Sequence, residues 1–405
     1  MALSDDLLGC LADRLLKQSD AMVQLVVDLA AIESPTSDLS SQRRVVSKIE
    51  DWLKPLGYRA RWIRVTGAEQ SRPTDFQSAG VCVFVPKRDF AEVLPHRAGK
   101  SRRQMLLGHV DTVWPLGTLE KMPIHQADQR LYGPGVFDMK GGIVQAMFAL
   151  KVISDLSLTP ALKPIMLLNT NEETGSPGTS EIIRTLAACC DRVFVLEPPV
   201  GHEGLLKTER RGGGFITLKV EGRAAHAGLN PTEGRNAIDK MVRTLNQLEA
   251  IRQRFPSVNF SPGLIHGGIA ANVVAPHCEV VVDVRLSSQN DLGRIKQELN
   301  SLVSESDDFR VDLEMDLERP PMEGNDRNQR LWESASRLAD RLGFEIDQTA
   351  VGGGSDGNFT SPVAATLDGL GAVGAGAHQS NEHLMLADLP KRAALLAALM
   401  MEQPA

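Results

Sequence analysis

Four short apolar runs, with a helical pattern between the second and the third, are the sequence feature that most restricts the possible folds of this chain. The runs are GVCVFV (80–85), MLLGHVDTV (105–113), IMLLNTN (165–171) and RVFVLEPP (192–199). Between the second and third lies KGGIVQAMFALKVISDL, which favours a helix that starts after paired glycines. Strands that alternate with helices predict an α/β fold, a mainly parallel sheet with helices on both faces. In such sheets, ligands bind beyond the carboxyl ends of the strands.

The length of the chain, 405 residues, is too great for one ordinary core and predicts two domains. Apolar periodicity within residues 1–66 predicts helices there. From 208 to 318 the pattern changes to strand, helix, strand, strand, helix, strand, with the second helix over 290–305, which is the order of a ferredoxin-like α+β unit. A helical pattern resumes after it. We therefore predict a discontinuous larger domain, 1–207 and 319–405, into which a smaller domain, 208–318, is inserted.

Composition excludes several classes of function. The net charge of −7 and the pI near 5.8 give no reason to expect nucleic-acid binding. No apolar stretch reaches the roughly 20 residues of a membrane span, and the N-terminal segment has the pattern of an amphipathic helix and not of a signal peptide. Cysteines are scattered and odd in number, so we expect them to be reduced in a cytoplasmic protein. They are Cys10, Cys82, Cys189, Cys190 and Cys278.

Residues that could bind metal follow the predicted strands. They are His109 and Asp111 in GHVDTV, Asp138 in YGPGVFDMKGG, Glu172 and Glu173 in NTNEETG, Glu197 in VLEPP, and His378 and His383 in GAHQSNEHL. Histidine nitrogens and carboxylate oxygens suit zinc, and a bridging carboxylate would hold two such ions together. One of the adjacent glutamates would then bind metal, while the other remains unligated as a general base.

Taken singly, each of these motifs has an ordinary explanation. A lone histidine is usually only hydrogen-bonded, two adjacent glutamates usually form a solvated turn, and Asp138 could cap the helix that follows it. The order of five motifs makes coincidence improbable: GHVDTV, GPGVFDMKGG, NEETGS, LEP and GAHQSNE. From about residue 20 onward, the sequence resembles the two-zinc amidohydrolase and exopeptidase family. That family contains acetylornithine deacetylase, succinyl-diaminopimelate desuccinylase and bacterial glutamate carboxypeptidase, the last of which it resembles most.

The resemblance implies a role for each motif residue. Asp138 would bridge two zinc ions, with cobalt or manganese as other possible metals. The remaining ligands would be His109 and Glu197 at one site, and Glu173 and His378 at the other, with His383 as the alternative to His378. Asp111 would orient His109, and Glu172 would be the general acid and base toward a bridging hydroxide. The resemblance also predicts a cis peptide bond between Asp138 and Met139.

The inserted domain would act as a lid and dimerisation domain, again by resemblance. GRAAHAGLNPTEGRNAI is similar to the family's SHAG segment, so His226 would stabilise an oxyanion, reaching the site from a partner subunit. Asn272 and Arg285 would contact the substrate's carboxylate or oxyanion. The backbone N–H groups of Gly352, Gly353, Gly354 and Ser355 would bind a second carboxylate. Three alternatives stay open: His226 as an exposed loop residue, Arg285 paired with Asp283 or Glu279, and the glycine run as a structural turn.

The implied function is hydrolysis of an amide bond next to an amino acid with a free carboxylate. The substrate would be a peptide with a C-terminal acidic residue such as glutamate, or an N-acyl amino acid. An acetylornithine-type deacetylase or a desuccinylase is the alternative within this class. A non-catalytic binding protein of the same fold is a remote alternative. A homodimer is expected by resemblance, with a small-molecule substrate as the other partner and neither nucleic acid nor membrane.

Overall fold

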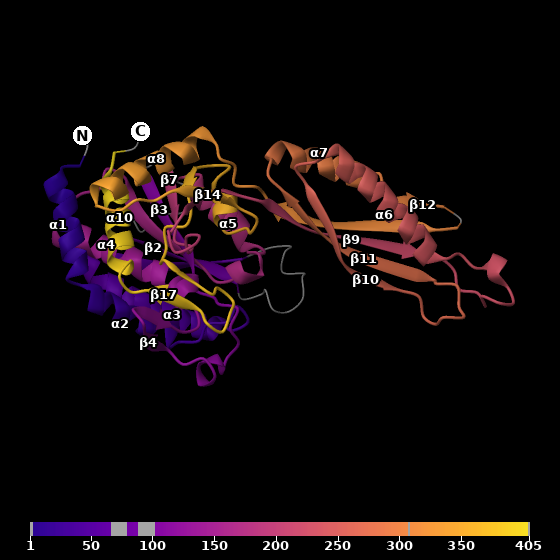
Figure 1. The fold of residues 1–405 in the computed structure, drawn as a ribbon, viewed down its shortest axis with the longest axis horizontal. Helices are drawn as coiled ribbons and strands as arrows, with labels where there is room; N and C mark the ends of the chain where they lie inside the picture. Colours follow the sequence, from indigo (N-terminus) through magenta and orange to yellow (C-terminus); the bar gives the residue numbers. More distant parts are fainter. Residues whose placement is uncertain (1–2, 66–78, 88–101, 307, 404–405) are drawn as a thin grey trace. The chain divides into compact units, whose positions relative to one another are not determined.

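The computed structural model describes residues 3–65, 79–87, 102–306 and 308–403, and the chain divides into two compact units (Figure 1). The first unit comprises Met1–Glu209, Gly324–Ala350 and Ser355–Ala405. The second comprises Arg210–Glu323 and Val351–Gly354. The roles predicted for them, catalytic domain and lid, stay predictions at this point.

The first unit is built around a six-stranded sheet with the order β1-β2-β6-β3-β7-β15. Its strands are β1 (Tyr58–Arg64), β2 (Gly80–Pro86), β6 (Lys163–Asn169), β3 (Arg103–His109), β7 (Arg192–Val195) and β15 (Ala365–Leu367). The pairs β6–β3, β3–β7 and β7–β15 are parallel, whereas β1–β2 and β2–β6 are antiparallel. Because β3, β6 and β7 are parallel, their carboxyl ends meet at one edge of the sheet.

Helices cover both faces of this sheet, as the sequence predicted (Figure 1). Alternate side chains of a strand enter different cores, so Leu106 belongs to one hydrophobic cluster, and Met105 and Leu107 to the other. The first cluster contains residues of α1 (Asp5–Leu16), α2 (Ser19–Ala30), α3 (Leu39–Leu53), α4 (Gly141–Asp155), α8 (Asp326–Arg341) and α10 (Leu389–Met401). The second contains residues of α5 (Thr179–Ala187) and α9 (Gly357–Thr360). The predicted α/β class is therefore confirmed.

Two predicted helical segments end earlier than expected. The N-terminal helices stop at a 3₁₀ turn, η1 (Lys54–Leu56), after which Gly57 takes a φ of 85°. The next residues form β1, an edge strand, so the prediction of helix through residue 66 was wrong. Likewise α7 ends at Asn300, and Ser304–Glu305 form a short strand, β12, instead of continuing the helix to 305.

Smaller elements complete the first unit. A four-stranded sheet has the order β16-β17-β5-β4, and β8 pairs with β14. These strands are β16 (Gly374–Ala375), β17 (His383–Met385), β5 (Arg130–Tyr132), β4 (His125–Ala127), β8 (Leu206–Arg210) and β14 (Gln348–Val351). Three short helical segments are η4 (Thr118–Glu120), η5 (Val136–Lys140) and η6 (Glu172–Thr174). Of these, η5 and η6 carry predicted metal ligands.

The second unit contains the predicted ferredoxin-like order. Its elements in chain order are β9 (Gly212–Glu221), the short segment η7 (Pro231–Glu233), α6 (Ala237–Arg254), β10 (Asn259–Gly267), β11 (His277–Leu286), α7 (Gln289–Asn300), β12 and β13 (Arg310–Arg319). They form an antiparallel five-stranded sheet, β10-β11-β9-β13-β12, in which β10 is an edge strand. One face packs against α6 and α7 to form a separate hydrophobic core. This unit therefore has a core of its own.

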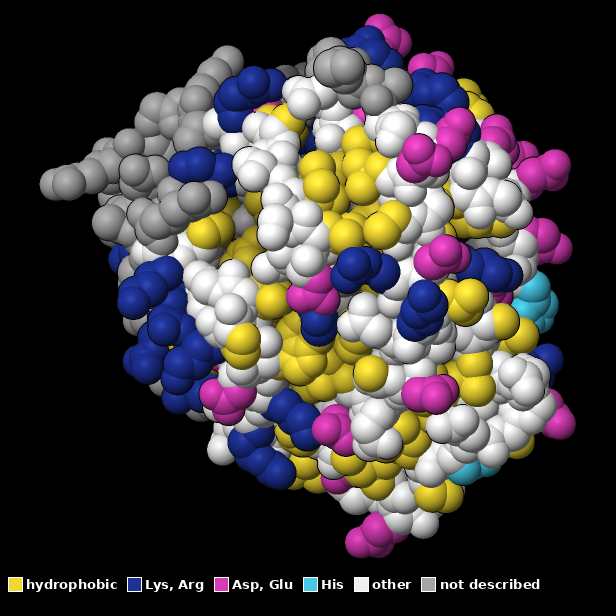
Figure 2. Space-filling view, turned by 90° about the vertical axis from the view of Figure 1, so that its left-hand side faces the viewer, with side chains coloured by type: hydrophobic (Ala, Val, Ile, Leu, Met, Phe, Trp, Pro, Cys, Tyr) yellow, Lys and Arg dark blue, Asp and Glu magenta, His cyan; other side chains and the backbone are white. Residues whose placement is uncertain are grey.

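The surface carries charge of both signs. On the face shown in Figure 2, Lys and Arg side chains gather mainly toward the left, and Asp and Glu side chains are scattered over the rest. Within the described ranges, no helix combines the length and apolar character needed to cross a bilayer. All five cysteines are free thiols in the structure.

Candidate metal centre

The candidate ligands lie where the central strands end. His109 is the last residue of β3, Glu172 and Glu173 follow β6 in η6, and Glu197 follows β7. Asp138 lies in η5, just before α4, and His378 lies between β16 and β17. Parallel strand ends place the first four residues at one edge of the sheet, and two further loops add the others. The arrangement explains why residues so far apart in sequence come together.

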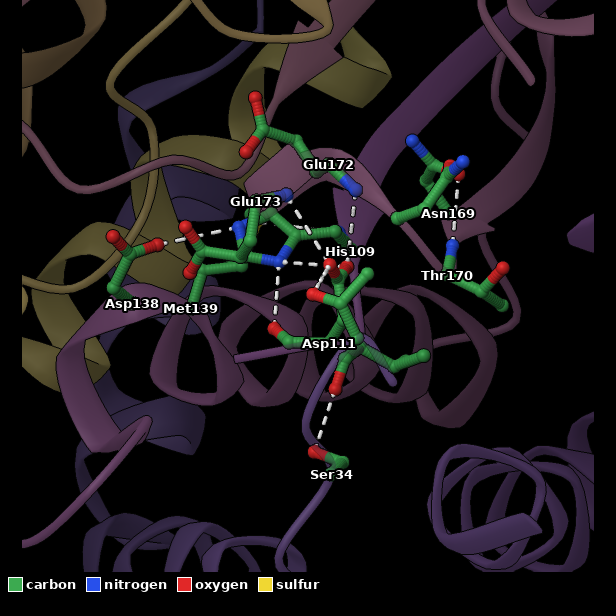
Figure 3. Close-up of polar contacts among 12 residues, drawn as sticks. Ser34, His109, Asp111, Asp138, Met139, Asn169, Thr170, Glu172 and Glu173 are labelled. Carbon is green, nitrogen blue, oxygen red and sulfur yellow. Dashed lines mark hydrogen bonds and ion pairs between the residues drawn. The ribbon is translucent and has the colours of Figure 1, made fainter. Parts of the chain in front are cut away.

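His109 is held in one tautomer. Its ring is buried, with 1% of the residue exposed, and Nδ1 lies 2.9 Å from the backbone oxygen of Asp111. Since that oxygen can only accept, the neutral ring carries its proton on Nδ1 and presents the lone pair of Nε2. Nε2 faces carboxylates: it lies 3.2 Å from Asp138 Oδ1 (Figure 3) and 3.5 Å from Glu197 Oε1. This is the orientation that a metal ligand needs.

Asp138 faces both histidines. Oδ1 lies 3.2 Å from His109 Nε2, and Oδ2 lies 3.4 Å from His378 Nε2. His378 Nε2 is in turn 3.2 Å from Glu173 Oε2. The carboxylate of Asp138 thus stands between two nitrogen donors, one on each of its oxygens. The peptide bond between Asp138 and Met139 is cis, as the resemblance implied.

The donor set fits divalent cations. One candidate group is His109, Asp138 and Glu173, and another is His109, Glu172 and Glu197, each with ligand atoms within 4.8 Å of one another. Glu173 Oε1 is buried and has no hydrogen-bond partner among the described residues, a costly state for a carboxylate oxygen. A cation would satisfy it. The sequence predicted Glu172 as unligated, and the structure places its carboxylate close to this donor set.

The pKa values of the histidines and of Glu173 reflect their burial and their contacts with one another in the absence of metal. Burial by itself lowers the pKa of His109, but contacts with Asp111, Asp138 and Glu197 outweigh it and hold the pKa well above 6.5. Contacts with Asp138 and Glu173 raise the pKa of His378 to about 10. Burial raises the pKa of Glu173. Without a bound cation, these shifts favour protonated imidazoles beside the carboxylates.

Asp111 organises the glutamates as well as His109. Its buried carboxylate accepts hydrogen bonds from the backbone N–H groups of Glu172 and Glu173, each at 3.2 Å, and from Thr36 Oγ1 at 2.7 Å. The Asp111 carboxylate lies 3.5 Å from His109 Nδ1, whereas the Asp111 backbone oxygen lies 2.9 Å from the same nitrogen. Figure 3 shows the backbone nitrogen of Glu172 directed at Asp111 and its carboxylate on the opposite side. Asp111 thereby fixes the start of η6.

A buried carboxylate that belongs to the last sequence motif, but for which no role was predicted, supports the backbone at Asp138. Glu382 is fully buried and accepts hydrogen bonds from the backbone N–H groups of Phe137 and Asp138, both at 3.1 Å. The indole N–H of Trp114 donates to its other oxygen at 2.7 Å. Burial raises the pKa of Glu382 to about 7. The available signal was its place in GAHQSNE, but its partners lie more than 240 residues away.

His383, the alternative to His378, lies in a different environment. It is 5% exposed, its Nδ1 lies 2.8 Å from the Asn381 oxygen, and its ring is tilted against Tyr132. His378 is the histidine beside Asp138 and Glu173.

The predicted oxyanion residue lies in the second unit. His226 is exposed, and its Nδ1 accepts hydrogen bonds from the N–H groups of Gly228 and Leu229 at 3.1 and 3.2 Å. The neutral ring therefore carries its proton on Nε2. Asn272 belongs to the neighbouring segment, because its backbone oxygen accepts from the Ala227 N–H at 3.0 Å. The structure brings these two predicted residues into one loop region.

The other predicted substrate contacts are engaged within the protein. Arg285 pairs with Asp283 through contacts of 2.8–3.1 Å, which was the structural alternative. The carbonyl oxygens of Gly353 and Gly354 accept from Arg210 at 3.1 and 3.2 Å. Ser355 belongs to the first unit, is fully buried, and donates its backbone N–H to Asn358 at 2.9 Å. The roles predicted for these residues stay predictions.

Comparisons with known proteins agree with the motifs. The model of Peptidase family M20/M25/M40 matches residues 105–402. Carboxypeptidase G2 from Pseudomonas sp. (strain RS-16) is 25% identical over 397 residues, which cover 95% of this chain and 90% of that protein. Succinyl-diaminopimelate desuccinylase from Azoarcus sp. (strain BH72) is 29% identical over 308 residues, which cover 71% and 80%.

Among solved structures, aminopeptidase PepT from Bacillus cereus superposes with a TM-score of 0.71 at 18% identity, covering 95% of this chain and 98% of that chain. This likeness concerns the fold. Since the family model spans most of the sequence, the chain belongs to Peptidase family M20/M25/M40.

Proposed function

We propose that the protein is a metal-dependent hydrolase that cleaves an amide bond next to an amino acid with a free carboxylate. The observation that carries the proposal is the position of Asp138, whose two carboxylate oxygens face different histidines, with Glu173 and Glu197 beside them. The buried, unpartnered oxygen of Glu173 supports it further.

Two divalent cations would be held by this donor set, most suitably zinc. His109, Asp138 and Glu197 would form one site, and Asp138, Glu173 and His378 the other. The ions would polarise the amide carbonyl and make a water-derived nucleophile available near neutral pH. Their identity is part of the proposal, and cobalt or manganese would suit the same ligands.

Glu172 would carry the proton during hydrolysis. Its backbone is fixed by Asp111, and its carboxylate lies within 4.8 Å of donor atoms of His109 and Glu197. A carboxylate in that place can accept a proton from the attacking water and later donate it to the leaving amine. As the resemblance implies, His226 would reach the site from a partner subunit and, with its proton on Nε2, donate a hydrogen bond to the oxyanion that develops on the carbonyl oxygen.

The substrate's free carboxylate would be bound by the residues that the resemblance assigns to it. Arg285, Asn272 and the N–H groups of the 352–354 glycines are the proposed contacts. Arg285 already shares its guanidinium with Asp283, so a substrate carboxylate would compete for it. The relatives favour two versions of the reaction, a carboxypeptidase on acidic C-terminal residues and a desuccinylase or deacetylase. A panel of acidic-ended dipeptides and N-acyl amino acids separates them.

The decisive experiment compares wild type with Glu172→Gln and with Glu181→Gln as a matched control on the exposed side of α5. We expect about two equivalents of metal in all three proteins. Hydrolysis should fall roughly 10²–10⁴-fold only in the Glu172 variant. Full turnover by Glu172→Gln would refute its role. Bound metal without hydrolysis of any panel member would favour the binding-protein alternative.

We also propose a homodimer formed through the second unit. The support is that β10 is an edge strand and exposes Leu264 and Ile265, of which 57% and 62% are accessible. An unpaired strand edge with apolar side chains favours pairing with another copy.

A further inference from the structure

The turn that carries Glu172 and Glu173 begins and ends at buried polar residues. It lies between Asn169, the last residue of β6, and Ser176, which precedes α5, and both of these residues are fully buried. The turn closes where the Ser176 N–H donates to the Asn171 backbone oxygen at 3.0 Å. The positions of the two glutamates therefore depend on how Asn169 and Ser176 are held.

One buried carboxylate contacts both ends of this turn. Asp356, of which 3% is exposed, accepts a hydrogen bond from Asn169 Nδ2 at 2.8 Å and another from Ser176 Oγ. Asn169 Nδ2 also donates to Ser176 Oγ at 3.0 Å, so the three side chains are joined to one another. Asp356 follows Ser176 by 180 residues in the sequence. The contact is therefore a tertiary one, which ties the loop before α9 to the end of β6.

The direction of each of these hydrogen bonds is fixed. Asn169 Oδ1 accepts from the Thr170 N–H at 2.8 Å (Figure 3), which leaves Nδ2 to face Asp356. Ser176 Oγ accepts from Asn169 and directs its own hydrogen at Asp356. A carboxylate accepts from two donors at once, and its charge strengthens both bonds. An amide in its place would leave one donor, the Asn169 N–H or the Ser176 O–H, without an acceptor.

The backbone of Ser176 shows that this end of the turn is constrained. Its φ is 59°, in the left-handed region that residues other than glycine seldom adopt. Such a conformation is unfavourable by itself and persists only where surrounding contacts impose it. The contacts here are the side-chain bond to Asp356 and the backbone bond to Asn171. Backbone outliers of this kind cluster at functional sites, which agrees with the two glutamates that the turn carries.

We propose that Asp356 is a positioning residue of the candidate metal centre. By holding Asn169 and Ser176, it fixes the turn between them and thereby the carboxylates of Glu172 and Glu173. The inference rests on the proposed function, because that function makes Glu173 a metal ligand and Glu172 the carrier of the proton.

The proposal has different consequences for the two metal sites. Glu173 is a proposed ligand in one of them, whereas His109 and Glu197 belong to the other. Displacement of the turn should therefore weaken the binding of one zinc equivalent and slow the proton transfer by Glu172. A general loosening of the fold should instead weaken both equivalents.

Asp356→Asn in the full-length protein tests the proposal. Competition with a fluorescent zinc chelator measures the Kd of each equivalent, and steady-state hydrolysis gives kcat and KM. We expect one equivalent to bind about 10–100-fold more weakly, while the other keeps its wild-type affinity. The change in hydrolysis should lie in kcat and not in KM. Asp368→Asn is the matched control, because Asp368 is also fully buried but accepts from Ser355 Oγ at 2.6 Å, outside the turn.

Two further variants keep the test decisive if Asp356→Asn does not fold. Asp356→Asn combined with Asn169→Asp exchanges the amide and the carboxylate, and it should restore the affinity of the weakened equivalent and kcat. Ser176→Ala removes one donor to Asp356 and should weaken the same equivalent by a smaller factor.

Three results would overturn the inference. They are wild-type affinity and kcat in the folded Asp356→Asn and Ser176→Ala proteins, equal weakening of both equivalents, and the same loss in Asp368→Asn. A wild-type protein that binds no zinc and hydrolyses no amide of the panel would overturn the proposed function, and this inference with it.

Discussion

At the scale of single residues, the carboxylates of the centre favour the protonated form of its histidines, whereas a metal binds the neutral form. Contacts with carboxylates raise the pKa of both His109 and His378, the latter to about 10. Metal binding requires neutral imidazole. Cations and protons therefore compete for the same carboxylates.

This competition gives a prediction with a definite sign. Because the pKa values are raised, binding metal at pH 7 should release protons, above all from His378, whose pKa is raised to about 10. Affinity should fall as the pH is lowered. Calorimetric titration of chelator-treated protein with zinc, in two buffers of different ionisation enthalpy, measures the release. His378→Gln should release fewer protons than wild type, and an unchanged count in that variant would contradict the assignment.

Glu382 and Trp114 lead to a second prediction. Glu382→Gln would keep one acceptor oxygen, but its amide N–H would face either the indole N–H of Trp114 or the backbone N–H groups of Phe137 and Asp138. Because two donors cannot form a hydrogen bond with each other, the backbone at Asp138 should be held less firmly. We expect metal affinity to fall about 10–100-fold. Trp114→Phe removes one hydrogen-bond donor to Glu382 and should lower the metal affinity by a smaller factor. Competition with a chromogenic chelator measures both, and wild-type affinity in a folded Glu382→Gln protein would show that this support is dispensable.

The residues that would lie close together were predictable because three motifs follow the parallel strands β3, β6 and β7, and the resemblance added Asp138 and His378. The residues that surround this group were harder to predict. Glu382 reaches Trp114 only after distant loops have docked, and nothing local in the sequence links the two. Arg285 shows the reverse case: Asp283 lies two residues away on the same strand face, so their pairing could be foreseen as an alternative.

At the scale of elements, the pattern of strands and helices was readable where apolar runs were long. Strand β1 was missed because YRARWIR mixes charged and aromatic residues, and its half-buried position on the sheet edge gives no apolar run. The short strand β12 is set by pairing with β13, which is a tertiary effect.

Glycine provides a prediction at this scale. A Cβ at Gly142, in the first turn of α4, would lie 2.1 Å from the Leu196 backbone oxygen, next to Glu197. Gly142→Ala should destabilise the protein by about 1–3 kcal/mol and weaken metal binding through Glu197. Gly293→Ala is the matched control, because Gly293 lies in α7 with open space around it. It should stabilise by about 0.5–1 kcal/mol. Denaturant titration measures both, and a neutral Gly142→Ala would refute the close approach.

At the scale of the whole molecule, the insertion of a ferredoxin-like unit followed from the change in element order near residue 208. The second unit of the structure also includes Val351–Gly354. The predicted boundaries had assigned this glycine run to the larger domain. The glycine run joins the second unit through tertiary contacts, which the sequence does not reveal. Among them are the hydrogen bonds that Arg210 donates to the carbonyl oxygens of Gly353 and Gly354.

The proposed dimer is testable at this scale. Ile265→Lys places a charge on the exposed edge strand β10 and should shift sedimentation from dimer to monomer while metal content stays the same. Val303→Lys, on a residue that is also exposed but lies outside β10, should leave the dimer intact. A wild-type protein that sediments as a monomer at micromolar concentration would exclude the proposal.

The long sequence separation of the bonds around Glu382 has a consequence for how the protein acquires its metal. The carboxylate joins segments 244–268 residues apart, and contacts of this kind form late because much of the chain must first be ordered. The metal-binding geometry should therefore appear only near the end of folding. A collapsed but incompletely folded chain should therefore bind zinc weakly and release it readily.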